Sequence, residues 1–169
     1  PYLWIFGNGG AGYYPTYTDD TFLIAGSGCV YGGGASDYDA VTSIDLNNQS
    51  LTTAFTDVLL SKFPSLREIN FGINSIPLLD VTHSLKLFEL RAPLNLINSI
   101  NLANNTLLEI LALDRNNLST INLSNNTLLK TVALDRNNLS SIDLSNNLLV
   151  DVLYLYNNNL DLLDVSNNT

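Results

Sequence analysis

A 21-residue period runs from residue 66 of this chain to its C-terminus. Each period contains the pattern L-x-x-L-x-L-x-x-N-x-L twice, with isoleucine or valine in place of some leucines. One period shows it in full: Leu108, Leu111, Leu113, Asn116 and Leu118, followed by Ile121, Leu123, Asn126 and Leu128. A fixed period of this length is typical of a solenoid, in which each repeat forms one coil and stacked coils share a core.

The two L-x-L pairs of each period predict two short strands, because side chains alternate between the faces of a strand. Stacked coils would pair these strands in parallel. The pattern therefore predicts two ribbons, the first near residues 69–71, 90–92, 111–113, 132–134 and 153–155. The second is expected near 79–81, 100–102, 121–123, 142–144 and 163–165. Only ten or eleven residues separate the two strands of a coil, which leaves no room for a helix between them.

The recurring asparagine has a structural explanation. Where the chain bends after a strand, buried backbone donors and acceptors need partners. An amide side chain offers both a donor and an acceptor. We therefore expect one ladder of Asn74, Asn95, Asn116, Asn137 and Asn158, and a second of Asn105, Asn126, Asn147 and Asn168. Their neighbours, such as Asn117 and Asn138, are expected to face solvent in turns where asparagine tolerates left-handed geometry.

Residues 66–169 resemble the leucine-rich repeat family, and specifically its nested 21-residue subclass found mainly in bacteria and sometimes called IRREKO. The resemblance implies a binding or structural scaffold without catalysis or cofactors. The chain departs from the family pattern at Ala92, at Pro93 and at Ser84, which replaces an asparagine.

Two segments precede the regular repeats. Residues 1–40 hold nine of the ten glycines and six of the eight tyrosines, which predicts short strands and glycine turns that cap the solenoid or attach it. Residues 41–65 predict a transitional coil. Apolar residues at helical spacing from Leu51 to Leu59, followed by Pro64, predict that this coil contains the one helix of the chain.

Charge excludes several classes of function. The formal net charge is −9, and no lysine or arginine occurs before Lys62. Nucleic acid binding needs basic patches, and anionic membrane surfaces attract basic segments. No apolar run approaches the roughly 20 residues that span a bilayer. The sequence thus predicts neither a nucleic-acid partner nor membrane insertion, and its composition favours an extracellular, cell-surface or virion location.

Motifs that could carry chemistry are few. Gly7 to Gly12 fit the dinucleotide pattern G-x-G-x-x-G, but Tyr13, Tyr14 and Pro15 follow where a helix should begin, which favours a glycine turn. His83 and Cys29 are the sole histidine and cysteine, so no internal disulfide and no His/Cys metal site is expected. We expect no catalytic residues and no enzyme activity.

An acidic and amide row is expected on the second ribbon, with two interpretations. Its members are Asp80, Asn101, Asn122, Asp143 and Asp164, together with Asp45. Oxygen ligands of this kind suit calcium. However, no spaced D-x-D-x-D-G loop is present, which favours a solvated face.

The outward positions of the first ribbon are the candidate ligand face. Arginine and tyrosine are favoured as interface anchors. The candidate residues are Asn70, Phe88, Arg91, Tyr154 and Tyr156, with Ala112 and Ala133 making the centre flat. Asp114 and Asp135 are expected to pair with Arg115 and Arg136 across coils. The ligand would be a surface protein or a glycan.

Nothing polar or helical closes the last repeat, which leaves three explanations: a longer natural chain, a docked second copy, or a tolerated bare end. Docking would make the protein a structural one that self-associates end to end in a surface, fibre or virion assembly. The candidate contacts are Tyr2, Trp4 and Phe6 against Leu160, Leu163 and Val165. Recognition or adhesion on the first ribbon is the alternative function.

Overall fold

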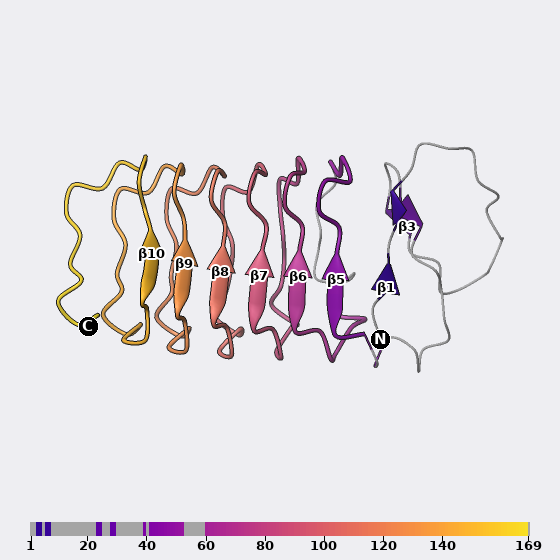
Figure 1. Cartoon of the computed structure of the whole chain (residues 1–169), viewed down its shortest axis with the longest axis horizontal. Helices are drawn as coiled ribbons and strands as arrows, with labels where there is room; N and C mark the ends of the chain where they lie inside the picture. Colours follow the sequence, from indigo (N-terminus) through magenta and orange to yellow (C-terminus); the bar gives the residue numbers. More distant parts are fainter. Residues whose placement is uncertain are drawn as a thin grey trace.

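The chain is an elongated parallel β-solenoid (Figure 1). The computed structural model describes residues 41–52 and 60–168, Asp39, and four two-residue strands nearer the N-terminus. These strands are β1 (Leu3–Trp4), β2 (Phe6–Gly7), β3 (Leu23–Ile24) and β4 (Gly28–Cys29). β2, β4 and β3 form a small antiparallel sheet.

A seven-stranded parallel sheet runs the length of the solenoid in the order β1-β5-β6-β7-β8-β9-β10. Its longer strands are β5 (Ser43–Asp45), β6 (Glu68–Asn70), β7 (Glu89–Arg91), β8 (Ile110–Ala112), β9 (Thr131–Ala133) and β10 (Val152–Tyr154). From β6 onward each residue pairs with the one 21 positions later, as Leu90 does with Leu111. The predicted first ribbon is confirmed to within one residue.

The core lies behind this sheet and follows the 21-residue period. Leu111, Leu113, Leu118 and Leu123 are each at most 1 % exposed. Burying a side chain of this size contributes about 1.5–3 kcal/mol. Each coil contacts mainly the two coils beside it, so this burial depends on the neighbours.

The asparagines of the first ladder bond between coils. Asn116 shows its geometry: its Oδ1 accepts a hydrogen bond from the N–H of Ile97 at 3.0 Å, and its Nδ2 donates to the carbonyl of Ala92 at 2.9 Å. Nδ2 also donates to Leu113 of its own turn. Each amide thus joins two coils and closes a bend. The cross-coil bonds recur at Asn74, Asn95, Asn137 and Asn158.

The second ladder forms with a different bonding pattern. Nδ2 of Asn126 donates to the carbonyls of Leu102 at 3.1 Å and Asn105 at 2.9 Å, both in the preceding coil. Asn147 repeats the pair of bonds. Oδ1 has no partner here, however, at Asn105, Asn126 or Asn147, although all three atoms are buried. This ladder therefore uses the donors of its amides and leaves their acceptors unused.

The second predicted ribbon differs from expectation. In the described part of these segments only Leu79 takes part in a β-bridge, and no strand forms. The residue in the middle of each segment, such as Asn122, accepts a bond from the backbone N–H two residues later. That bond turns the chain before a strand can extend. Leu128, which closes the second phrase, is 37 % exposed, whereas Leu129 is buried.

Left-handed backbone occurs at one position of each 21-residue coil, and at Asn48 and Ser50 in the coil before them. Ile73, Leu94, Arg115, Arg136 and Asn157 all have φ between 53° and 56°. These residues immediately precede the first asparagine ladder. The solvent-facing Asn117 and Asn138 are exposed as expected, but they do not have positive φ. The turn thus places its left-handed residue two positions earlier than predicted.

Two expectations lie largely outside the described residues. The helix predicted from Leu51 to Leu59 falls mostly on residues 53–59; among the described residues only Leu60 is helical. The cap predicted at residues 1–40 is described only through its four short strands and Asp39. One of these strands, β1, pairs in parallel with β5, with Leu3 opposite Ile44 and Trp4 opposite Asp45.

Candidate protein-interaction face

The outer face of the seven-stranded sheet carries the predicted ligand residues. In each three-residue strand the first and last side chains point outward, since the middle residue is in the core. The last positions of β6 to β10 are therefore neighbours, about 4.8 Å apart. In order they are Asn70, Arg91, Ala112, Ala133 and Tyr154. The sheet thus brings together residues spread over 84 positions of sequence.

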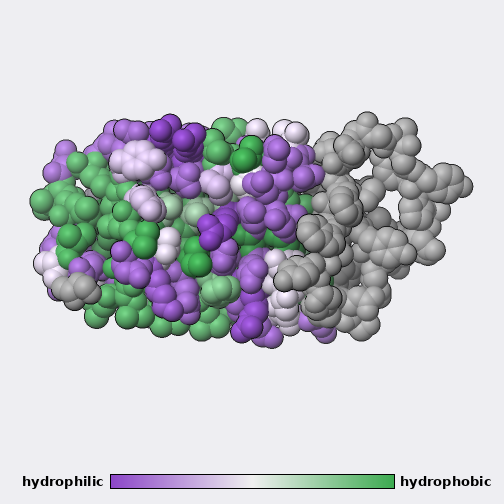
Figure 2. All heavy atoms as spheres, in the orientation of Figure 1, coloured by the Kyte–Doolittle hydropathy of each residue, from purple (hydrophilic) through white to green (hydrophobic). Residues whose placement is uncertain are grey.

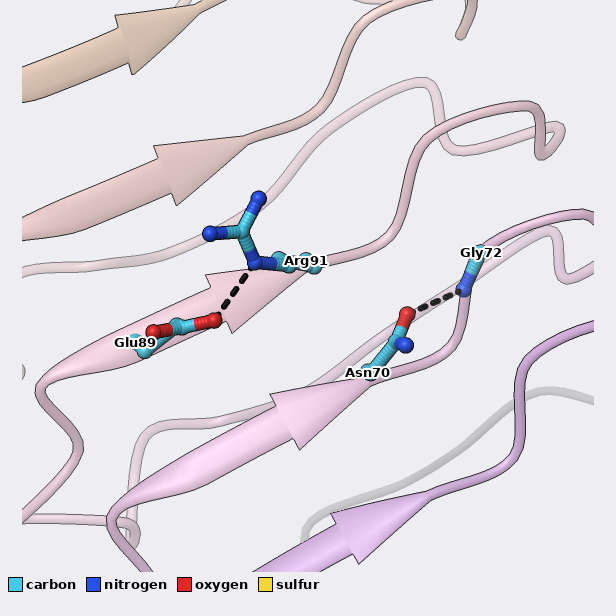
Figure 3. Close-up of polar contacts among 4 residues, drawn as sticks. All are labelled: Asn70, Gly72, Glu89 and Arg91. Atoms are coloured by element: carbon cyan, nitrogen blue, oxygen red, sulfur yellow. Dashed lines mark hydrogen bonds and ion pairs between the residues drawn. The ribbon is translucent and has the colours of Figure 1, made fainter.

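Arg91 and Asn70, at one end of this row, are each held by their own coil (Figure 3). The Arg91 guanidinium forms an ion pair with Glu89 on the same strand. Asn70 Oδ1 accepts a hydrogen bond from the N–H of Gly72 at 3.3 Å. Arg91 stays exposed. Phe88, just before β7, is half-buried and lies at the N-terminal ends of the strands, opposite to the end where Arg91 lies.

Two tyrosines dominate the opposite end. Tyr154 ends β10 and is 50 % exposed, and Tyr156 follows it at 53 %. The Arg136 guanidinium carbon lies 5.8 Å from the centre of the Tyr156 ring, which is within cation–π range. Aromatic side chains this exposed are suited to contact with a partner.

Asp114 and Asp135 occupy the outward position two residues beyond the strands. The predicted pairing with Arg115 and Arg136 does not form: within residues 41–52 and 60–168, the ion pairs are Glu89–Arg91 and Glu109–Lys130. Asp135 is only 6 % exposed. Partial burial, followed by the charge of Asp135, raises the pKa of the Asp114 carboxyl above its usual value. A hydrogen bond from its own backbone N–H, and then the charges of Arg115 and Arg136, oppose this rise in pKa.

The acidic and amide row has a structural role in the coils. Oδ1 of Asp80, Asn101, Asn122, Asp143 and Asp164 accepts the backbone N–H two residues later, at 2.9–3.1 Å. Aspartate and asparagine are interchangeable here because both supply this oxygen. Bonds from Ser145 and Ser166 lower the pKa of Asp143 and Asp164. Asp45 does not belong to this row: it ends β5 and lies opposite Asn70 on the main sheet.

Residues singled out for catalysis or metal binding remain dispersed. His83 is exposed in its turn, and Cys29 lies in β4. The Gly7–Gly12 motif falls largely outside the described residues. Where side chains are described, no group of three histidine, cysteine or acidic residues could hold a metal ion. No helix in the described residues is long and apolar enough to cross a membrane.

The last coil is far more exposed than those before it. Leu163 and Val165 are 40 % and 42 % exposed, whereas Leu144, one coil before Val165, is 1 % exposed. Leu160 is half-buried, while Leu139 is fully buried. Tyr2 lies outside the described residues, and Trp4 and Phe6 are described only as members of β1 and β2. The predicted contact of these aromatic residues with the last coil remains a prediction.

Sequence reasoning missed an exposed apolar edge. Leu107, Leu128 and Leu149 occupy one position in three successive coils and are 37–50 % exposed, with Leu148 beside them at 55 %. Figure 2 shows hydrophobic side chains gathered below β8 to β10, at the turns that precede these strands. The signal available in the sequence was the pair of adjacent apolar residues at 107–108, 128–129 and 149–150, of which each coil buries only the second.

The solenoid is similar to solved structures of Listeria monocytogenes proteins. A functional domain of InlJ, described as including a cysteine ladder, superposes with a TM-score of 0.59 at 24 % identity, over 79 % of this chain and 39 % of that one. An internalin, InlF, gives 0.51 at 19 %, over 73 % and 50 %. The chain thus spans half or less of these relatives. No protein-family model matches it, and no curated protein is similar enough to match.

The architecture defines a leucine-rich repeat fold: a parallel solenoid of about five coils with 21-residue spacing. Its described repeats carry asparagine ladders and contain no cysteine, so the ladder reported for InlJ has no counterpart in them.

Proposed function

We propose that this protein is a non-catalytic scaffold that binds protein partners at a cell surface or outside the cell. The main support is the outer sheet face, a rigid surface on which Arg91, Tyr154 and Tyr156 are exposed. The similarity to internalin structures agrees with a role in protein interaction or adhesion.

The sheet face can be tested with a double substitution. The chain, displayed on beads, would be assayed against a panel of purified cell-surface proteins and glycans. Arg91→Ala with Tyr154→Ala should weaken binding of a partner at least about tenfold, the loss expected of two interface anchors. Ser119→Ala with Ser140→Ala, on the turns away from this sheet, is the matched control. Equal binding by both variants would contradict the proposed face.

End-to-end self-association is the second candidate, because the last coil exposes Leu163 and Val165. In this arrangement the N-terminal segment of a second copy, with Tyr2, Trp4 and Phe6, covers these side chains and repeated contacts build a fibre. Sedimentation velocity should show concentration-dependent growth of the wild-type chain. Leu163→Asp with Val165→Asp should abolish this growth, while Leu85→Asp, exposed on another coil, should not. A wild-type monomer at high concentration would contradict self-association.

A further inference from the structure

The outer sheet face has a shallow depression, called the step below, at β8 and β9, where the outward side chains are small. Ala112 and Ala133 lie between the larger side chains of Arg91 and Tyr154 in the same row. Ala112 is only 8 % exposed although it points outward. The side chains of this row are therefore only methyl groups at Ala112 and Ala133, and they are large again at Tyr154.

Two carboxylates border this step. Asp114 and Asp135 follow the alanines by two residues, so strand alternation places them on the same face. Asp135 is more than nine-tenths buried, and neither carboxylate forms an ion pair with a described residue. Asp114 accepts a hydrogen bond from its own backbone N–H. Arg91 pairs with Glu89, Lys130 pairs with Glu109, and Arg136 lies over Tyr156. The charges of Arg115 and Arg136 act on Asp114, but neither arginine forms an ion pair with it.

This arrangement is costly for the free protein. A desolvated carboxylate without a partner destabilises the folded state, and a second one beside it adds repulsion. The raised pKa of Asp114 has these two causes, in that order. A cation placed between the carboxylates would offset both, and it would also be shielded from water by the neighbouring side chains.

We propose that Asp114 and Asp135 form a subsite for an arginine side chain of a partner protein, with Ala112 and Ala133 as its floor and Tyr154 as its wall. This subsite deepens, and rests on, the proposed binding at the sheet face. A guanidinium is planar and has five donors, so it can bond two carboxylates about 4.8 Å apart on adjacent coils. Its flat face can also stack on a tyrosine ring, which an ammonium group does less well.

A matched pair of peptides tests the subsite in the intact chain. The probes are Ac-Ala-Arg-Ala-NH2 and the same peptide with citrulline, which keeps the shape but removes the charge. Binding would be followed by the NMR shifts of backbone amides, and the pKa of Asp114 by its side-chain carbon shift. The arginine peptide should saturate shifts around residues 112–114, 133–136 and 154–156 and lower the pKa of Asp114. The citrulline peptide should do neither.

Asp135→Asn should weaken the arginine peptide at least about tenfold, since a charge-assisted hydrogen bond is lost. Asp151→Asn is the control, because it removes the same charge from an exposed position just before β10, at the opposite ends of the strands. Equal shifts with both peptides, or equal losses in both variants, would overturn the subsite. If the subsite fails while Arg91→Ala with Tyr154→Ala still abolishes partner binding, only the subsite is wrong. Should that double variant bind normally as well, the sheet face itself is not the binding surface.

Discussion

Oδ1 of Asn137 accepts a hydrogen bond from the backbone N–H of Leu118 at 2.9 Å, and so joins two coils across the core. Nδ2 of the same amide donates to the carbonyl of Leu113, also in the preceding coil, at 2.9 Å. The side chain is 6 % exposed. One residue thus satisfies a donor and an acceptor of the preceding coil that water cannot reach.

Asn137→Ala is expected to destabilise the protein by about 3 kcal/mol, because two buried backbone groups lose their partners. Asn138→Ala is the matched control: its side chain is exposed, and its effect should stay within about 0.5 kcal/mol. Urea denaturation followed by circular dichroism measures both. Similar midpoints for the two variants would show that the ladder contributes little.

Ile73 has φ of 54°, a conformation unfavourable for a β-branched residue, and is 48 % exposed. Asn157 occupies the equivalent position with φ of 55°. Ile73→Asn should stabilise the protein by about 1 kcal/mol, and Asn157→Ile should destabilise it by a similar amount, since asparagine tolerates the left-handed region. Thermal unfolding checks both directions. A fall in stability for Ile73→Asn would mean that apolar contacts of Ile73 outweigh its backbone strain.

Leu111→Ala should cost about 2–5 kcal/mol, because Leu111 is fully buried and its loss leaves a cavity between coils. Leu162→Ala changes the same side chain where it is 80 % exposed, and should have an effect within about 0.5 kcal/mol. Calorimetry of both variants tests the assignment of inward positions. A large effect at Leu162 with a small one at Leu111 would contradict it.

The raised pKa of Asp114 predicts a pH dependence of stability. Between the unfolded value near 3.8 and the higher folded value, the folded state binds more protons than the unfolded state. The contribution of this group to the free energy of unfolding is therefore greatest below the unfolded pKa and falls as pH rises through the window. Asp114→Asn should remove that decline, whereas Asp151→Asn should leave it. The measurement is the urea midpoint of each variant from pH 3.5 to 7. The same pH dependence of the midpoint in wild type and Asp114→Asn would contradict the prediction.

Much of the coil could be predicted from sequence because its burial pattern repeats. The period fixed the strand pairing of Leu90 with Leu111, and an amide after each strand predicted the first ladder at Asn95 and Asn116. These features depend on local alternation and on one residue's bonding capacity. The second ribbon was not predictable in the same way, because Asn122 turns the backbone by a side-chain bond that hydropathy does not reveal.

The amino-acid sequence by itself determined the length of each coil, its inward leucines and its bonded asparagines, since a 21-residue unit can bury its apolar side chains only against copies of itself. The tertiary structure alone decided which leucine of a Leu-Leu pair faces solvent and which residue takes positive φ. It also decided that Asp114 and Asp135 remain unpaired beside two alanines. The physical reason is that stacking sets distances between residues 21 apart, and those distances determine whether opposite charges meet.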